Sequence, residues 1–144
     1  HAMAAGLTIN PQNFEKFKEA FTEAITMHLK GKKPIIELLT DGQLDSSEIT
    51  FKNADLLRQA SPWGQGFEEP IFYGDFELVE QRVVGEKHLK CNLKLQGTNS
   101  LLEGIAFFQD KLDSKKVRAA YKLNVNSFRG NESLQLMIES IESA

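Results

Sequence analysis

The sequence predicts a mainly β protein of the α+β class, in which an amphipathic helix precedes a small closed or partly closed barrel of about five to six strands. Two observations favour this fold. Residues 72–141 contain five short apolar segments, several of them alternating, that are separated by turn residues. Residues 10–31 instead carry apolar side chains at helical spacing. Five or six strands suit a barrel better than a sandwich, because they leave few strands for two sheets.

Composition places the chain among ordinary globular proteins. Its 144 residues, 41% hydrophobic and 26% charged, allow one domain with a core, or a small domain plus a fragment of another. No apolar run approaches the roughly 20 residues that cross a membrane, and no signal-peptide pattern is present. The single cysteine, Cys91, cannot form an internal disulfide, which favours a cytoplasmic location.

The predicted N-terminal helix has clear end signals. Asn10 can cap it, Pro11 suits its first turn and Gly31 can end it. A polar break at residues 31–34 is the best boundary, which gives domains at 1–33 and 34–144. One face of the helix contains Phe14, Phe17, Phe21, Ile25, His28 and Leu29 at helical spacing. The stripe of the three phenylalanines is interpreted as helix core.

Two elements are predicted between the boundary and the barrel strands. The apolar residues 35–39, followed by the turn signal Asp41-Gly42, indicate a strand. Residues 50–60 indicate a short helix capped by Thr50, and residues 61–70 a loop rich in glycine, proline and aromatic residues. The inward residues of the short helix are predicted to be Leu56, Leu57 and Ala60.

The barrel strands are predicted at residues 72–84, 89–95, 101–108, 117–125 and 134–141. We expect the first to bend or bulge at Gly74 and to end in a tight type II′ turn at Gly85-Glu86. The turn before the last strand is placed at residues 127–131. Alternation puts these residues inside: Leu89, Cys91, Leu93, Leu95, Val117, Ala119, Tyr121, Leu123 and Val125.

Three stretches carry a resemblance to a known family. Residues 1–6 resemble the end of a Gly-Gly-Gly-His-x-x-Ala-Ala-Gly signature, which several related phosphodiesterases share. Residues 56–58 with 61–72, and residues 84–90 with 121–130, are more specific. Together they resemble the C-terminal region of RecJ exonucleases, members of the DHH phosphoesterase superfamily, over nearly the whole chain.

The resemblance implies an OB-type barrel in a 5′-to-3′ exonuclease that degrades single-stranded DNA during recombinational and mismatch repair. It implies that residues 1–33 end a truncated DHH-associated domain. Mn²⁺ or Mg²⁺ would be held by Asp and His residues of a catalytic DHH domain. We find no DHH triplet and no metal-ligand spacing here, so we expect this chain to bind no metal or other cofactor and to be inactive alone. One departure is that the link at 109–116, where OB barrels usually have a helix, reads as a polar loop.

The predicted DNA site combines basic and aromatic residues. Residues 111–131 contain six basic residues and one acidic residue. The OB resemblance places the first hairpin and the loop after the fourth strand beside one nucleic-acid groove. Phosphate contacts and base stacking would then hold a single strand, although a solvated polar face remains the alternative. The predicted DNA-binding residues are Arg82, Lys87, His88, Lys90, Lys122, Phe128 and Arg129, with Lys94 on the same polar face.

Four residues have two interpretations each. Trp63 and Phe67 either stack on bases or, as we favour, pack at the domain junction and the barrel end. His1 matches the signature histidine and would contact the substrate phosphate in the parent enzyme, whereas here it is more simply a chain terminus. Phe128 is also a candidate plug for the barrel end.

A rival hypothesis makes the barrel a protein-interaction or architectural module. It would brace the nuclease, or bind a single-strand-binding protein or a helicase. The acidic balance of residues 35–75 and the net charge of −3 support it. Salt dependence discriminates the two hypotheses, because binding through phosphates weakens steeply with added salt.

Overall fold

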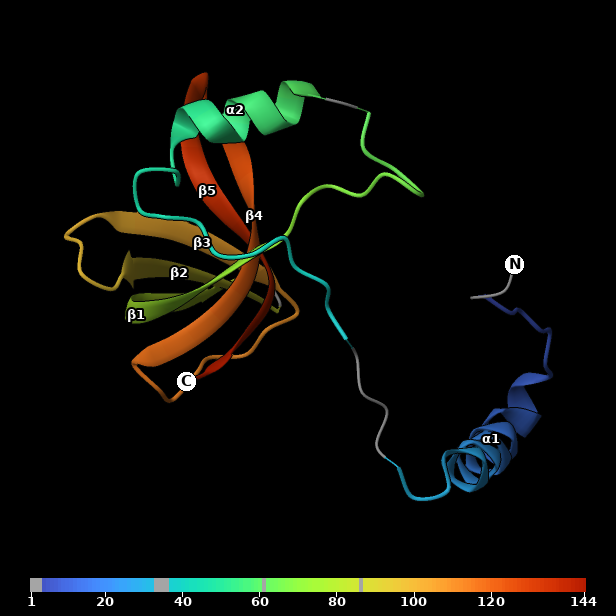
Figure 1. Ribbon diagram of the computed structural model, residues 1–144. Coiled ribbons are helices and arrows are strands. Elements are labelled where there is room, and N and C mark those ends of the chain that lie inside the picture. The colour runs from blue at the N-terminus through green and yellow to red at the C-terminus, as the bar shows by residue number, and fades with distance from the viewer. Residues whose placement is uncertain (1–3, 33–36, 61, 86) are drawn as a thin grey trace. The chain divides into compact units, whose positions relative to one another are not determined.

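The chain divides into two compact units, His1–Leu38 and Leu39–Ala144. The computed structural model describes residues 4–32, 37–60, 62–85 and 87–144. The first unit contains one long helix, and the second contains a short helix and five strands (Figure 1). The predicted boundary at residues 33–34 and the candidate His1 lie outside the described residues.

The first unit consists of a 3-10 turn, Pro11–Asn13, that leads into helix α1, Phe14–Leu29. Asn10 caps the turn as predicted, because its side-chain oxygen accepts from the Gln12 N–H at 3.0 Å. The helix ends at Lys30, which adopts the left-handed conformation with φ of 49° and donates its N–H to the Met27 carbonyl. Gly31 follows this cap.

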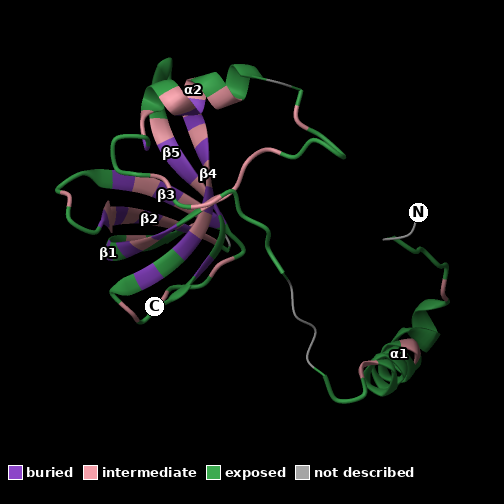
Figure 2. Cartoon of the chain, viewed as in Figure 1, coloured by how far each residue is buried: buried purple, intermediate pink, exposed green. Residues whose placement is uncertain are grey.

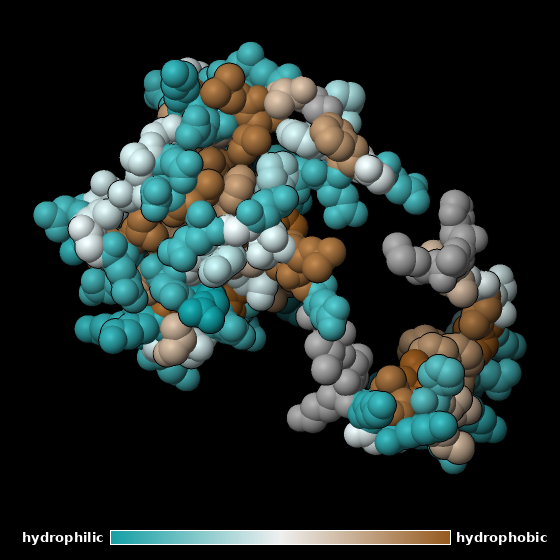
Figure 3. Space-filling view, viewed as in Figure 1, coloured by the Kyte–Doolittle hydropathy of each residue, from teal (hydrophilic) through white to brown (hydrophobic). Residues whose placement is uncertain are grey.

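The apolar stripe of α1 is not covered within its own unit. No residue of α1 is buried (Figure 2), and apolar side chains lie on the surface of this unit (Figure 3). Phe14 and Phe21 are 51% and 54% exposed. Phe17 and Phe21 stack on each other with ring centroids 5.5 Å apart. The described residues of this unit include no strand and no second α-helix that could cover the stripe, so its role as core stays a prediction.

The second unit opens with a segment that pairs along the first barrel strand. Strand β1 spans Phe72–Val84, and Gln43 forms a parallel bridge with its residue Tyr73. The Tyr73 N–H donates to the Gly42 carbonyl at 3.0 Å. Residues 37–39 form no strand, so the prediction of a strand there is wrong, and residues 35 and 36 lie outside the described part. The pairing begins later because Asp41-Gly42 continues along β1 instead of turning.

Helix α2, Phe51–Ala60, lies against the barrel. Thr50 caps it as predicted, accepting the Asn53 N–H at 3.2 Å. Ala54 is fully buried and Leu57 packs on the core, whereas Leu56 is 54% exposed. Leu56 and Ala60 were therefore wrongly predicted to face inward, because the buried stripe runs through positions 54 and 57. Neither α1 nor α2 is long and apolar enough to cross a membrane.

Five strands close into a barrel in the order β1-β2-β3-β5-β4. The further strands are β2, His88–Leu95; β3, Leu101–Phe107; β4, Lys116–Phe128; and β5, Asn131–Ser143. Neighbours are antiparallel except β3 and β5, and β1 closes the ring by pairing with both β2 and β4. The predicted mainly β fold with an N-terminal helix is confirmed. The link between β3 and β4 contains no helix, and α2 instead packs against β4 and β5.

The barrel interior contains the residues that alternation predicted. The inward positions of β2 and β4 are all buried, as Figure 2 shows. Gly104 lets β3 and β5 approach closely, because a Cβ there would lie 2.8 Å from Ile138 Cδ1 and 3.1 Å from Cys91 Sγ. The largest fully buried side chains are those of Tyr121, Phe76, Leu89, Leu93, Leu136 and Val117.

Two local predictions for β1 need correction. The register shifts between Leu78 and Glu80, whereas Gly74 pairs regularly with Ala119. Gly74 instead leaves room for the Phe76 ring, which lies 3.1 Å from where a Cβ would stand. The pair Val84–His88 leaves three residues in the first hairpin loop rather than a two-residue turn, although Gly85 has the expected positive φ of 61°.

Candidate nucleic-acid interface

The outer faces of β1, β2 and β3 form one continuous surface beside the β1–β2 loop. On β2 the residues that alternate with buried Leu89, Cys91 and Leu93 point outward. Each of these outward residues is paired with one residue on β1 and one on β3. We call this surface the β1–β3 outer face; its three cross-strand rows are Val84, His88 and Phe107; Arg82, Lys90 and Ile105; and Glu80, Asn92 and Glu103.

Aromatic rings gather at the loop end of this face. The His88 ring meets the rings of Phe107 and Phe108 edge-on, with centroids 5.0 and 5.2 Å away. The Phe108 N–H donates to His88 Nδ1 at 3.4 Å, so that nitrogen is the acceptor of the imidazole. Phe107 and Phe108 are nevertheless 50% and 80% exposed. Phe108 also adopts the left-handed conformation with φ of 55°, which is costly for a bulky residue.

Basic side chains lie beside these rings. Lys87 is exposed in the β1–β2 loop, immediately before His88. Arg82 is exposed on β1, directly opposite Lys90 and one row from His88. The cluster therefore offers aromatic surface and positive charge together. We call it the aromatic–basic end of the outer face, and it consists of Arg82, Lys87, His88, Phe107 and Phe108.

The row of Asn92 is acidic, since it contains Glu80 and Glu103. Lys90 forms an ion pair with Glu103 at 2.8 Å, and Gln135 donates to the same carboxylate at 2.6 Å. Asn92 donates to Glu80 at 3.0 Å. A small pocket of about 200 Å³ lies here, lined by Glu80, Arg82, Lys90, Cys91, Asn92 and Glu103. The charge of Lys90 is thus partly balanced, and the two carboxylates would repel a phosphate at this point.

Lys122 does not lie with the other predicted DNA-binding residues. Lys122 of β4 is paired with Met137 of β5, Met137 with Ile105 of β3, and Ile105 with Lys90 of β2. Lys122 and Lys90 are therefore three strand spacings apart along the sheet, or about 14 Å. The Lys122 ammonium lies 3.0 Å from Glu139 and 3.7 Å from Glu69. Partial burial lowers the pKa of Lys122, but hydrogen bonds and charges from these two carboxylates outweigh it and raise the pKa overall.

Phe128 and Arg129 form a second exposed aromatic and basic pair at the β4–β5 hairpin. The Arg129 guanidinium lies over the Phe128 ring, 5.1 Å from its centroid, and Phe128 is 64% exposed. Phe128 does not plug the barrel end. In the parallel β3–β5 register Ala106 is paired with Ile138, so Phe107 lies level with the next residue of β5. The hairpin at the start of β5 is about eight residues from that position, or about 26 Å along the strand. The predicted residues therefore divide between two places on the barrel.

Trp63 and Phe67 make structural contacts. The Trp63 indole N–H donates to the Leu57 carbonyl at 3.0 Å, which satisfies an orphan carbonyl in the last turn of α2. The two rings stack with centroids 4.9 Å apart. Gly64 and Phe67 close a tight turn with two backbone hydrogen bonds of 2.9 and 3.0 Å. These contacts favour the structural interpretation, although Phe67 is 57% exposed and its outer ring face is accessible.

Phe107 and Phe108 are the site residues that sequence reasoning missed. They were interpreted as the end of an apolar strand. A signal was present, since a strand that alternates buried and exposed positions cannot bury two adjacent phenylalanines. Ala106 takes the buried position, so Phe107 points outward. Phe108 is exposed because β3 ends at Phe107 and the chain turns there, with a φ of 55° at Phe108.

A metal centre finds no support in the described part of the chain. Within it, no three His, Cys, Asp or Glu side chains come together as metal ligands would. The described residues therefore do not offer the ligand set of a Mn²⁺ or Mg²⁺ site.

The strand order identifies the class of fold. A closed barrel of five strands in the order β1-β2-β3-β5-β4 is an OB-type barrel. Its aromatic–basic end lies on the first three strands, where OB-type barrels bind nucleic acids. Comparison with known proteins gives the family. Residues 40–140 match the RecJ OB domain. The chain belongs to the RecJ OB domain family, and the resemblance to RecJ is confirmed.

Curated relatives extend the similarity to nearly the whole chain. The chain is 45% identical to proteins named single-stranded-DNA-specific exonuclease RecJ from Salmonella typhimurium and Escherichia coli, over 98% of its own length. It is 40% identical to the protein of that name from Haemophilus influenzae. It spans 25% of the first two relatives and 26% of the third.

Two solved structures share the fold. Crystal structures of RecJ from Thermus thermophilus in complex with Mg²⁺ and with Mn²⁺ match with TM-scores of 0.57 and 0.58, at 23% and 24% identity. The matches cover 95% and 96% of this chain, and 21% and 20% of the Thermus chains.

Proposed function

We propose that this barrel is the single-stranded-DNA-binding domain of a RecJ-type 5′-to-3′ exonuclease that serves recombinational and mismatch repair. In this proposal the chain grips one strand and feeds it to a catalytic domain elsewhere in the longer protein. That domain would use Mn²⁺ or Mg²⁺, and the setting would be the cytoplasm, where the DNA lies. The observation that carries the proposal is the aromatic–basic end of an OB-type barrel, where two exposed phenylalanines contact His88, with Lys87 next to it in the chain and Arg82 one row away.

The physical basis is stacking combined with phosphate contact. Exposed rings cost free energy in water, and the left-handed backbone of Phe108 adds a further cost. A base stacked on such a ring contributes about 1–3 kcal/mol and does so for any sequence. Arg82 and Lys87 would contact phosphates on either side, which adds affinity without sequence preference.

The aromatic–basic end would be the main contact. Lys90 would contribute less because Glu103 already binds it. Phe128 and Arg129 would form a separate, distal contact, since the strand register places them far from Phe107. Lys122 would contribute least, because two carboxylates surround it.

Substitutions test this assignment through binding of a labelled oligothymidylate, followed by fluorescence anisotropy. We expect Phe108→Ala to weaken binding about tenfold, as loss of one stacked base would. We expect Arg82→Gln to weaken it several-fold and to reduce its salt dependence. Lys52→Gln, at an exposed position on α2, is the matched control and should leave binding unchanged.

The contrary result would be an affinity that neither substitution changes. In that case the contact lies elsewhere on the barrel, and Phe128→Ala would show whether the β4–β5 hairpin carries it.

A second function is favoured by the acidic part of the same face. Glu80 and Glu103 lie one row from Arg82, and the whole chain has a net charge of −3. These charges suit a protein partner better than a phosphate backbone. The barrel would then brace the nuclease or bind a single-strand-binding protein or a helicase. Such binding would change little with salt where its interface is largely apolar.

A further inference from the structure

A row of alternating charges crosses three strands on another part of the barrel. Glu77 of β1 is paired with Lys94 of β2 on one side and with Lys116 of β4 on the other. Lys115 precedes Lys116 in the sequence and borders the same region. This row lies beyond the β1–β3 outer face, because β1 pairs with β4 only over residues 72–77.

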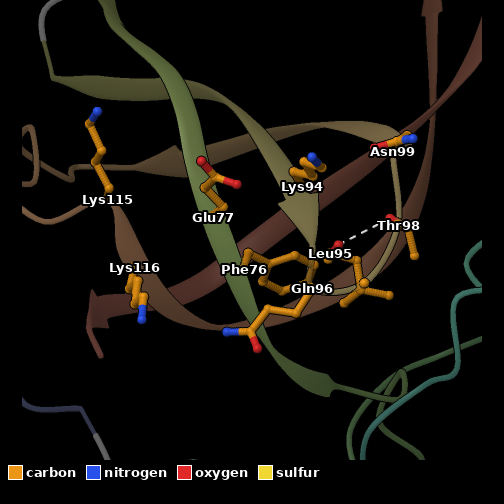
Figure 4. A pocket seen from close by; sticks show the side chains of 10 residues that line it. Phe76, Glu77, Lys94, Leu95, Gln96, Thr98, Asn99, Lys115 and Lys116 are labelled. Atoms are coloured by element: carbon orange, nitrogen blue, oxygen red, sulfur yellow. Dashed lines mark hydrogen bonds between the residues drawn. The ribbon is translucent and has the colours of Figure 1, made fainter.

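The row borders a pocket of about 730 Å³. Buried Phe76 forms part of its wall, and the β2–β3 turn closes one side. Figure 4 shows Lys94 on one side of Glu77 and the two other lysines on the opposite side. We call this hollow the Lys94 pocket; it is lined by Phe76, Glu77, Lys94, Leu95, Gln96, Gly97, Thr98, Asn99, Lys115 and Lys116.

The charges of the pocket favour an anion. The lining includes three lysines and one glutamate, which gives an excess of two positive charges. Among the described residues, none of these lysines has a carboxylate oxygen within 4.0 Å, in contrast to Lys90 and Lys122. An anion that entered would therefore meet ammonium groups that no ion pair within the described chain already holds.

The turn at the rim adds polar groups in fixed positions. The backbone N–H and the hydroxyl of Thr98 both donate to the Leu95 carbonyl, at 3.1 and 3.0 Å. These two bonds hold the turn, and Gly97 supports it with a positive φ of 78°. The exposed side-chain amides of Gln96 and Asn99 are then left as donors at the rim.

The Lys94 pocket is separate from the aromatic–basic end. Lys94 follows His88 by six residues on one strand, a distance of about 20 Å. The carboxylates of Glu80 and Glu103 lie between the two places, in the row of Asn92. A strand that touched both sites would have to pass over this acidic row.

We propose that the Lys94 pocket binds a phosphate group, and that in the proposed function this group belongs to the backbone of the bound strand. The phosphate chemistry follows from the lysines and the rim amides. Only the source of the phosphate rests on the proposed function. The carboxylate of Glu77 would repel the phosphate, so the affinity of the pocket would be low. We therefore expect that removal of this carboxylate tightens binding.

Amide chemical shifts of the 144-residue chain test the pocket with two probes, an oligothymidylate and inorganic pyrophosphate. We expect both probes to move the signals of Thr98, Asn99 and Lys116. Glu77→Gln should tighten both titrations about fivefold, as removal of one charge at about 4 Å in water would. Lys94→Gln should weaken them by a similar factor, and Lys52→Gln should change nothing. Thermal unfolding of each variant checks that the barrel stays folded.

The outcomes separate the pocket from the proposed function. Shifts with pyrophosphate alone would uphold the phosphate site and overturn the strand as its source. No shifts with either probe, or an affinity that Glu77→Gln leaves unchanged, would overturn the site. Signals of His88 and Phe107 report on the aromatic–basic end independently. If the oligothymidylate moves the signals of His88 and Phe107 but neither probe moves the pocket signals, the pocket proposal is wrong and the proposed function is supported.

Discussion

The hydroxyl of Tyr121 is a polar group placed inside an apolar barrel. Tyr121 is fully buried, its ring meets Phe76 edge-on at 5.6 Å, and its hydroxyl has no hydrogen-bond partner among the described residues. A buried hydroxyl without a partner costs about 1–3 kcal/mol, whereas the ring itself stabilises the core. The two contributions of this residue therefore oppose each other.

Tyr121→Phe separates these contributions. The substitution keeps the ring and removes the hydroxyl, so we expect the free energy of unfolding to rise by about 1 kcal/mol in urea titrations. Tyr73→Phe, at a residue that is 38% exposed, is the control and should have almost no effect. A loss of stability in Tyr121→Phe would mean that the hydroxyl is bonded, for example to a buried water.

The same residue predicts how stability depends on alkaline pH. Burial raises the pKa of Tyr121 from 10.0 to about 12. Because the folded state holds its proton more tightly than the unfolded state, the stabilisation is complete below pH 10 and is lost as the pH rises towards 12. Burial, and then the charge of Glu103, likewise raise the pKa of Cys91 from 9.0 to about 11, so both residues act in the same direction.

Urea titrations between pH 9 and pH 12 measure this effect. We expect stability to fall across this interval by an amount on the order of 2 kcal/mol for Tyr121. The fall should be smaller in Tyr121→Phe, which has no phenol to ionise. Parallel curves for the two proteins would show that Tyr121 does not titrate differently in the folded and unfolded states.

At the scale of elements, α2 is a helix that precedes the barrel strands in the sequence and packs on two of them. It packs on β4 and β5 through Ala54 and Leu57, and Arg58 reaches Glu132 at 2.9 Å. The helix precedes the barrel in the sequence, yet it covers apolar surface of the strands that follow. Its start is fixed by Thr50, which makes the cap the simplest point at which to perturb it.

Thr50→Ala should cost about 1 kcal/mol of stability, because the Asn53 N–H loses its acceptor. Thr50→Ser keeps a hydroxyl at the same position and should retain most of that stability. Circular dichroism during urea unfolding measures both variants. Equal stability of the wild type and Thr50→Ala would show that α2 is held by packing alone.

Most of the barrel was predictable because strand alternation is a direct consequence of burial on one face. Leu89, Cys91 and Leu93 could be placed inside from their spacing alone. The inward face of α2 was not predictable in detail. Its short sequence has apolar residues on two sides, and only contact with β4 selects Ala54 and Leu57 over Leu56. The pairing of Gln43 with Tyr73 is equally a tertiary contact that no local pattern encodes.

The candidate site was predictable only in part, for a related reason. Charge and strand position identified Arg82, Lys87 and His88, which the fold brings to one end of the outer face. Whether a lysine is available to bind DNA depends on its neighbours across the sheet. Lys90 and Lys122 meet glutamates that are distant in the sequence, and this pairing requires the register. The separation of the β4–β5 hairpin from this end follows from the register as well.

At the scale of the whole molecule, the closed barrel allows an acidic protein to present a local basic surface. The net charge is −3, but charges more than about 8–10 Å apart are largely screened at physiological salt. Arg82 and Lys87 can therefore act on a strand beside them while more distant carboxylates have little effect. The proposed function requires that this surface binds single-stranded DNA through phosphates and stacked bases.

Titration of the unmodified chain with labelled single-stranded and double-stranded oligonucleotides at two salt concentrations tests that claim most directly. With two to three phosphate contacts, we predict that affinity for the single strand falls about tenfold between about 50 and 200 mM salt. We also predict a clear preference for the single strand, because a duplex cannot stack its bases on Phe107 and Phe108. If the chain does not bind at low salt, or binds the duplex with equal affinity, this surface does not bind single-stranded DNA in the proposed way, and the protein-interaction function is favoured.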